Sequence, residues 1–321
     1  MGVAPKQLGL ICRRIGLSFV TLILVSGLIF MATQGLPGDV ARMILGKEAG
    51  AEQVEALRSQ LGLNLPLIEQ YMRWVGSLLS GDLGFSAASN RSVADLVGPR
   101  VENSFALVAI SMVLALPISV LLGVATANFK DTWFDRIAMA TSLGVNALPE
   151  FVLGLLLVVV FSTNVLHVVP AVSLLSPGKP FYQQLGAYVL PVATLFLLQT
   201  TYLYRLVRGT MIDVLASDYV QFARLKGMSS GRILFRHALP NAAVPAIQAA
   251  ANVFALSVGG VVVVEYVFGY PGMGTALTDA VGNRDIPVVQ FIVLIIAATF
   301  LLSNMIADLA AALLTPPGRG A

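Results

Sequence analysis

Glu150 is the residue whose type and position point most directly to chemistry. It is an acid near the middle of a long apolar run, directly after Pro149. A carboxylate at that depth in a bilayer is costly, so such a residue typically lines a polar pathway or faces a buried partner. Asn146 lies one helical turn earlier on the same face. Both are candidates for a pathway that carries an amine. A polar partner on another chain, or a position nearer the inner face, would also explain Glu150.

The sequence lacks the patterns of the common catalytic and metal sites. No glycine-rich loop is followed by Lys and Ser/Thr, so we do not expect the chain to hydrolyse ATP itself. It has no metal-binding histidine helix and no nucleophile elbow. His167 and His237 are lone histidines, which we interpret as polar loop residues, and Cys12 is the single cysteine. We therefore expect no enzyme activity, no metal and no cofactor in this chain.

Residues 217–245, SDYVQFARLKGMSSGRILFRHALPNAAVP, are polar and basic but regularly punctuated. Asp218 is suited to cap a helix, and Gly227 to end it in a left-handed conformation. Ser230 is suited to cap a second helix that ends near Pro240. The pattern predicts a short helix between two turns, which is a rigid object that another protein can grip. The alternative is a basic loop with no partner.

Residues 265–290, EYVFGYPGMGTALTDAVGNRDIPVVQ, form a second punctuated segment. Pro271, Gly272 and Gly274 are expected to end the preceding helix in a tight turn near the membrane, followed by a short helix over residues 276–281. The segment is a candidate gate at the outer mouth of a pathway, and the alternative is a purely structural turn. The candidate gate residues are Glu265, Pro271, Gly272, Gly274, Arg284 and Asp285.

Six apolar segments must position these residues. Of all residues, 57% are hydrophobic and 12% are charged, against about a quarter charged in ordinary soluble domains. A helix needs roughly 20 apolar residues to cross a hydrocarbon core of about 30 Å. The predicted spans are residues 15–33, 104–127, 137–165, 185–204, 242–264 and 288–314. The sequence therefore predicts an all-α integral membrane protein, whose third and sixth spans are long enough to tilt or kink.

The positive residues predict which ends of these spans face inward. If the N-terminus is inside, the inside segments hold Lys6, Arg13, Arg14, Lys130, Arg136, Arg205, Arg208, Arg224, Lys226, Arg232, Arg236 and Arg319. The two short outside loops hold Lys179 and Arg284. The asymmetry predicts both termini inside, with residues 1–14 and 315–321 as short inner ends.

Residues 34–103 then lie outside, and they are too long for a bare connector. Two helical patterns are present, one with Val54 and Leu57 on a shared face and one with an apolar stripe that includes Tyr71 and Trp74. We expect a small helical segment that either docks an external protein or caps the ends of the spans.

The polar segment at residues 217–245 resembles the coupling motif, or EAA motif, of ABC-importer permeases. In that motif a Glu-Ala-Ala triplet precedes a glycine and, later, a Leu-Pro pair. The residues at the family spacing are Ala223, Gly227, Leu239 and Pro240, with Gln221 and Phe222 in place of the first two triplet residues. The peptide-importer branch has related submotifs, represented here by Tyr219 with Val220, residues 223–227 and residues 236–241.

Other segments resemble the same permeases. Residues 265–290 are similar to the family's Glu-x-Val-Phe, Pro-Gly-x-Gly and Arg-Asp-x-Pro-Val-Val-Gln submotifs. The LPGD run at Leu36, Pro37, Gly38 and Asp39, the runs LGLNLPLIEQY and GDLGFS, and the pair Asp308 and Leu309 are further likenesses. The chain thus resembles, over almost its whole length, the permeases of dipeptide, oligopeptide and nickel importers.

The resemblance implies a type I importer permease with six transmembrane helices, pore-forming and ATP-driven, which moves di- or oligopeptides across a bacterial inner membrane. In its terms, residues 34–103 are periplasmic and residues 104–314 are the permease core, with a cytoplasmic coupling loop at 217–241 and a periplasmic loop at 265–287. The coupling residues it implies are Tyr219, Val220, Gln221, Ala223, Arg224, Lys226, Gly227, Leu239 and Pro240.

The resemblance also implies partners. These are a second homologous permease in a pseudo-symmetric heterodimer, two cytoplasmic subunits that bind ATP and Mg, a periplasmic binding protein and the lipid bilayer, but no nucleic acid. Alternative cargoes within the family are nickel chelates and glutathione. From other classes, an ion-coupled carrier without ATPase partners and a membrane scaffold stay open as alternatives.

Overall fold

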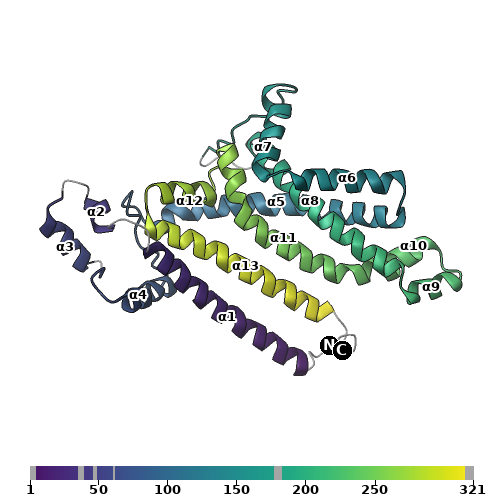
Figure 1. The fold of residues 1–321 in the computed structure, drawn as a ribbon, viewed down its shortest axis with the longest axis horizontal. Helices are drawn as coiled ribbons and strands as arrows, with labels where there is room; N and C mark the ends of the chain where they lie inside the picture. The colour runs from purple at the N-terminus through teal and green to yellow at the C-terminus, as the bar shows by residue number, and fades with distance from the viewer. Residues whose placement is uncertain (1–4, 35–39, 46–48, 61, 177–182, 315–321) are drawn as a thin grey trace. The chain divides into compact units, whose positions relative to one another are not determined.

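The computed structural model describes residues 5–34, 40–45, 49–60, 62–176 and 183–314 (Figure 1). Within these ranges the chain forms helices, and the β-pairing found there is one isolated bridge between Phe85 and Ser92. The α-helices are α1 (Pro5–Gln34), α2 (Val40–Leu45), α3 (Ala51–Gln60), α4 (Leu67–Leu79), α5 (Val93–Asn128), α6 (Trp133–Ala147), α7 (Glu150–Val158), α8 (Leu185–Leu215), α9 (Asp218–Leu225), α10 (Ser230–Ile233), α11 (Leu239–Phe268), α12 (Met273–Gly282) and α13 (Ile286–Leu314). Two π-helical turns, η1 (Val159–Thr163) and η3 (Leu234–Ala238), continue α7 and α10.

Five of the described helices are long and apolar enough to cross a membrane, by length and composition. They are α1, α5, α8, α11 and α13, and the bent pair of α6 with α7 and η1 makes a sixth if it counts as one span. The predicted all-α membrane fold is confirmed. Two helices are much longer than the spans expected from the sequence. Both α5 and α8 continue as helix beyond the apolar stretch that predicted the span.

The third predicted span, residues 137–165, is not one continuous helix. It forms two helices, α6 and α7 with η1, whose axes bend by 104° at the break between them. Leu148 is extended (φ −85°, ψ 133°), and so is Pro149 (φ −57°, ψ 146°). Proline lacks an N–H and disfavours helical geometry in the residue before it, so the sequence Leu-Pro breaks the helix here. Glu150 is therefore the first residue of a new helix.

The chain separates into two compact units. The first comprises residues 1–18, 105–270 and 299–321, and the second comprises residues 19–104 and 271–298. In the first unit, α8 packs against α6, α7 and α11. Small residues allow the close approach: Ala242, Ala246 and Ala249 of α11 are buried in clusters with residues of α8.

Close approach within the first unit is sharpest at Gly123 of α5. A Cβ added there would lie 2.7 Å from Cγ1 of Val207 and 3.1 Å from the backbone nitrogen of Arg208. Any larger side chain would push α5 away from α8.

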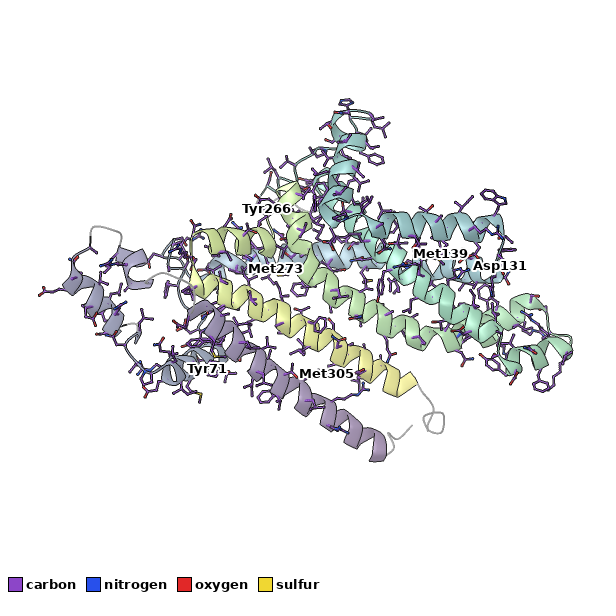
Figure 2. The ribbon with its side chains drawn as sticks, viewed as in Figure 1. Tyr71, Asp131, Met139, Tyr266, Met273 and Met305 are labelled. Atoms are coloured by element: carbon purple, nitrogen blue, oxygen red, sulfur yellow. The ribbon has the colours of Figure 1, made fainter. Side chains whose placement is uncertain are left out.

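In the second unit, α4 lies against α1 (Figure 1). The ring centroids of Phe30 and Tyr71 are 5.6 Å apart, and those of Phe30 and Trp74 are 5.8 Å apart. The Tyr71 hydroxyl also lies 2.8 Å from the Ser26 hydroxyl. Figure 2 labels Tyr71 on α4. The predicted apolar stripe with Tyr71 and Trp74 is thus the face of α4 that packs on α1. A separate contact joins α13 to α1, where Gln290 donates to the Thr33 hydroxyl at 2.7 Å.

Candidate functional site

The polar segment predicted to be helix, turn, helix begins with α9. Ser217, not Asp218, is the N-cap residue, and its extended backbone (φ −68°, ψ 152°) starts the helix one residue earlier than a cap at Asp218 would. Gly227 has φ +76°, and its N–H bonds to the carbonyl oxygen of Arg224 at 2.9 Å. Glycine adopts this left-handed conformation without a Cβ penalty, so it ends the turn as the sequence predicts.

One face of α9 is buried and the other is exposed. Val220 is fully buried and Ala223 is 8% exposed, and both pack with Ile233 of α10. The opposite face carries large apolar side chains: Phe222 is 64% exposed and Leu225 is 83% exposed. The helix is therefore anchored on its own loop and presents an apolar surface outward.

The predicted coupling residues divide between these two faces. Those on the exposed side are Tyr219, Gln221, Arg224 and Lys226. Sequence reasoning did not assign Phe222 and Leu225 to the coupling set. Phe222 and Leu225 are three residues apart and lie on the side of the helix opposite Val220 and Ala223. This spacing is the sequence signal that marks them as surface apolar residues.

The second predicted helix does not end near Pro240. Instead α10 runs through the π-helical turn η3 into α11, with Pro240 in the first turn of α11 and Leu239 half-buried. Pro240 has no N–H to donate to the preceding turn, and that turn, η3, is a π-helical turn and not an α-helical one. The predicted coupling loop is thus continuous with α11. The side chain of His237 lies outside the part that the structure describes.

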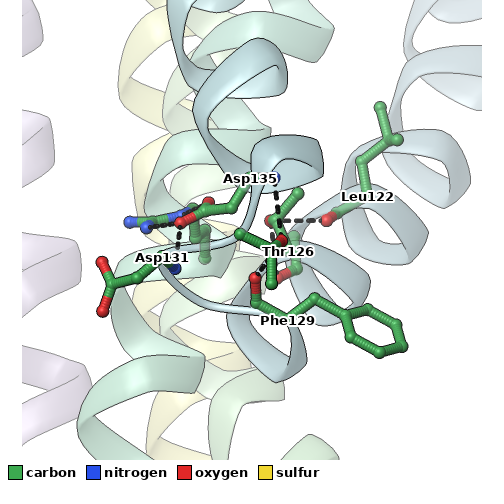
Figure 3. Close-up of polar contacts among 8 residues, drawn as sticks. Leu122, Thr126, Phe129, Asp131 and Asp135 are labelled. Carbon is green, nitrogen blue, oxygen red and sulfur yellow. Dashed lines mark hydrogen bonds and ion pairs between the residues drawn. The ribbon is translucent and has the colours of Figure 1, made fainter.

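A buried ion pair joins α6 to α8, and sequence reasoning missed it. Arg208 of α8 donates to both carboxylate oxygens of Asp135 of α6, at 2.5 and 2.6 Å. The Asp135 side chain is 4% exposed. Its carboxylate also accepts from the N–H of Asp131 at 3.0 Å, and Thr132 caps α6 by accepting from the N–H of Asp135 (Figure 3). Asp135 and Arg208 are 73 positions apart in the sequence, so no local pattern reveals that they pair.

Asn146 and Glu150 line one cavity of about 170 Å³ in the first unit. Asn146 donates to the Thr201 hydroxyl at 2.7 Å and to the Ser142 carbonyl at 3.1 Å. Despite the break at Pro149, the two candidate pathway residues share this cavity with residues of α8 and α11.

The candidate gate residues fall in both units. Glu265, in α11 of the first unit, is fully buried. The helix then ends at Gly269, which is left-handed (φ +60°), and the N–H of Tyr270 bonds to the Glu265 carbonyl at 2.9 Å. The sequence predicted that Pro271 ends this helix, but the helix ends earlier, at Gly269, because glycine takes the left-handed conformation freely. Burial raises the pKa of the Tyr270 phenol.

In the second unit, the turn at Pro271 is tied to the start of α5. The Pro271 carbonyl accepts from Asn103 at 2.9 Å, and the Met273 N–H donates to Ser104 at 2.7 Å. Gly272 is the extended N-cap of α12, and Gly274 is buried in its first turn. The short helix predicted over residues 276–281 lies within α12.

Asp285 is a clamp between loops of the second unit. Its carboxylate accepts from the Ser86 hydroxyl and from the Ala87 N–H, the latter at 3.0 Å. Arg284 is exposed with φ +56°, and among the ion pairs of the described residues none joins it to Asp285. The two residues therefore act separately, and Asp285 holds the segment at residues 86–87.

Two comparisons of sequence decide the family. Residues 119–317 match the binding-protein-dependent transport system inner membrane component, and residues 7–120 match the N-terminal part of the membrane component of such systems. The chain belongs to this family. Its members are the inner-membrane permeases of ABC importers, so the resemblance to dipeptide and oligopeptide importer permeases is confirmed.

Curated relatives match this permease over almost its whole length. The glutathione transport system permease protein GsiC of Escherichia coli (strain K12) is 37% identical over 299 residues, which cover 93% of this chain and 95% of that protein. The protein of the same name from Shigella flexneri serotype 5b (strain 8401) is 36% identical over the same shares of the two chains.

A solved structure shares the fold of the permease. The crystal structure of an amino acid ABC transporter with histidines matches with a TM-score of 0.51 and 18% identity, over 68% of this chain and 94% of that chain. The permease is thus a multi-pass inner-membrane subunit of an ABC importer, which works with the other subunits of such a transporter. Its LPGD run at residues 36–39 and its tail at residues 315–321 lie outside the described residues.

Proposed function

We propose that the chain is one of two homologous, pore-forming permeases in a pseudo-symmetric heterodimer that imports di- or oligopeptides. A periplasmic binding protein delivers the cargo, and two cytoplasmic subunits bind ATP and Mg. Full-length similarity to permeases named for glutathione transport supports cargo of this chemical kind, because glutathione is itself a small peptide. Glutathione is therefore the principal alternative cargo, and a nickel chelate is the next.

The observation that carries the proposal is the construction of α9. A short helix with an exposed apolar face is anchored by Val220 and Ala223, and the chain enters it from α8 and leaves it toward α11. Movement of α9 by a partner would be passed to two spans, because the π-helical turn continues α10 into α11. A carrier that works without an ATPase has no use for such a surface.

The proposed orientation follows the positive residues. Both termini and α9 are cytoplasmic, and residues 34–103 with α12 are periplasmic. Residues 1–14 and 315–321 are then the cytoplasmic ends, and the permease core is residues 104–314. In this arrangement Tyr219, Phe222 and Leu225 face an ATPase cleft.

Cargo is tested with the complete importer purified and reconstituted in proteoliposomes with its binding protein. We expect ATP-dependent accumulation of a labelled dipeptide, with glutathione and a nickel chelate competing weakly. Omission of ATP or of the binding protein should abolish accumulation. Efficient uptake of glutathione alone, or of the nickel chelate alone, would mean that this compound and not a peptide is the cargo. Uptake driven by an ion gradient without ATP would refute the proposed class of ATP-driven importer.

A further inference from the structure

The cavity of about 170 Å³ that contains Glu150 has more hydrogen-bond acceptors than the protein itself satisfies. It lies among α6, α7, α8 and α11, all within the first unit. Apolar side chains form part of its wall, and the polar residues that line it are Asn146, Glu150, Gln199, Tyr202 and Ser257. Sequence reasoning assigned no role to the last three.

The carboxylate of Glu150 lies against the backbone of α11. A Cβ added to Gly260 would be 3.2 Å from Oε1 and 3.4 Å from Oε2. The absence of a side chain at Gly260 therefore makes the room that the carboxylate occupies. Within the part of the chain that the structure describes, no hydrogen bond or ion pair satisfies this carboxylate.

Gln199 supplies a second unsatisfied acceptor. The residue is 2% exposed, and its Nε2 donates to the Ser257 hydroxyl at 3.0 Å. Its Oε1 is buried without a hydrogen-bond partner. A buried acceptor left unpaired is costly, and the usual explanation is a ligand or water that pairs with it. Glu150 and Gln199 thus line the same cavity, and among the described residues neither the Glu150 carboxylate nor Oε1 of Gln199 has a hydrogen-bond donor.

The chemistry that completes this arrangement is a primary ammonium group. It carries a positive charge and three N–H donors, which match a carboxylate and neighbouring amide or hydroxyl oxygens. A bound divalent metal typically has several carboxylate or imidazole ligands, and the described residues contain no cluster of three or more His, Cys, Asp or Glu side chains. The cavity is also smaller than the roughly 300 Å³ at which sites for drug-sized ligands begin, so it fits one end of a cargo molecule.

We propose that this cavity binds the protonated α-amino end of the cargo during translocation, with Glu150 as counter-ion and Gln199 as hydrogen-bond acceptor. The inference rests on the proposed import of peptides. Linear peptides and glutathione both have one α-ammonium group, so the site suits either cargo. A lysine or arginine of the second permease would be a different source of the same chemistry, and the experiment separates the two.

The test uses the reconstituted importer and two cargoes, a labelled dipeptide and its des-amino analogue. The binding protein is first saturated with each cargo, and its occupancy is measured separately, so that its own preference does not enter the uptake rate. For Glu150→Gln we expect uptake of the dipeptide to fall by about tenfold or more, since a charge-assisted hydrogen bond is lost. Uptake of the des-amino analogue should be unchanged.

Gly260→Ala tests the same site without removing the charge. The added methyl would press on the carboxylate from 3.2 Å, so dipeptide uptake should fall selectively. Gly144→Ala in α6 is the matched control, because an added Cβ there meets nothing within 4 Å. Co-purification of the second permease and ATP hydrolysis stimulated by the binding protein report whether each variant is assembled.

Two results would overturn the inference while peptide import stands. One is unchanged dipeptide uptake in both site variants. The other is an equal loss for both cargoes together with loss of the second permease, which would mean that Glu150 pairs with a cation of that subunit. A wild-type importer that accumulates neither peptide nor glutathione would instead refute the proposed function and remove the basis of the inference.

Discussion

At the scale of single residues, the best-defined interaction is the ion pair of Asp135 and Arg208. Both charges are largely removed from water, with side-chain exposures of 4% and 16%. Each is satisfied by the other, and Asp135 is further held by the Asp131 N–H. Loss of one partner from such a pair typically costs about 3–5 kcal/mol, because the remaining charge stays buried and unpaired.

We therefore expect Asp135→Asn to lower the free energy of unfolding by about 3 kcal/mol, and Arg208→Met to act similarly. The double variant Asp135→Leu with Arg208→Met should recover much of that loss, since no charge is then stranded. Thermal unfolding of the detergent-solubilised complex measures the effect.

The control is the pair of Arg14 and Asp308, whose side chains are 50% and 40% exposed. An exposed pair contributes about 0–1 kcal/mol, so Asp308→Asn should shift the unfolding midpoint little. If Asp135→Asn and Asp308→Asn shifted the midpoint equally, burial would not be the source of the stability.

At the scale of elements, two proline-dependent features shape the permease. Pro149 breaks the third span and makes Glu150 the first residue of α7. Pro240 sits in the first turn of α11, where it leaves α10 and α11 joined through η3. The same residue type thus breaks one helix and is accommodated in another, where the preceding turn is π-helical.

The exposed face of α9 leads to an element-scale prediction. Leu225→Asp should abolish co-purification of the ATPase subunits, because a charge would be buried in the proposed contact. Leu225 is 83% exposed in the chain alone, so the substitution should not unfold it. Leu79→Asp in α4 is the matched control, since Leu79 is 85% exposed and lies on the proposed periplasmic side. Retention of the ATPase by Leu225→Asp, with uptake intact, would exclude α9 as the docking element.

At the scale of the whole molecule, the proposed orientation places α4 and α9 on opposite sides of the membrane. Cys12 is the single cysteine, so a Cys12→Ser chain offers a clean background for labelling. Ser80 and Ser229 are both exposed, at the end of α4 and after α9.

In that background we expect Ser80→Cys to react with a membrane-impermeant maleimide on intact spheroplasts. Ser229→Cys should react only after permeabilisation, because the proposed orientation puts it in the cytoplasm. Uptake by each variant checks that the importer is assembled. The reverse pattern of labelling would invert the proposed topology, and labelling of both positions in intact spheroplasts would contradict it.

The sequence by itself determined the number and the approximate place of the apolar segments, because length and hydropathy are local properties. It also predicted a short helix that ends at Gly227, since glycine and capping residues act within a few positions of themselves. It placed some ends wrongly: Ser217 rather than Asp218 caps α9, and Gly269 rather than Pro271 ends α11. Several residues near each end are chemically able to cap it, and the surrounding packing decides among them.

Only the tertiary structure decided which distant groups meet. The Asp135 and Arg208 pair spans 73 positions, and the contact of Ser86 with Asp285 spans 199. The cavity joins Glu150 with Gln199 and Ser257 from two other helices. Such contacts depend on how helices approach and rotate, which is set by small residues along the whole interface rather than by the pattern beside either partner. The sequence could mark Glu150 as costly, but the packing of α8 and α11 around it gave that residue a cavity and an unpaired neighbour.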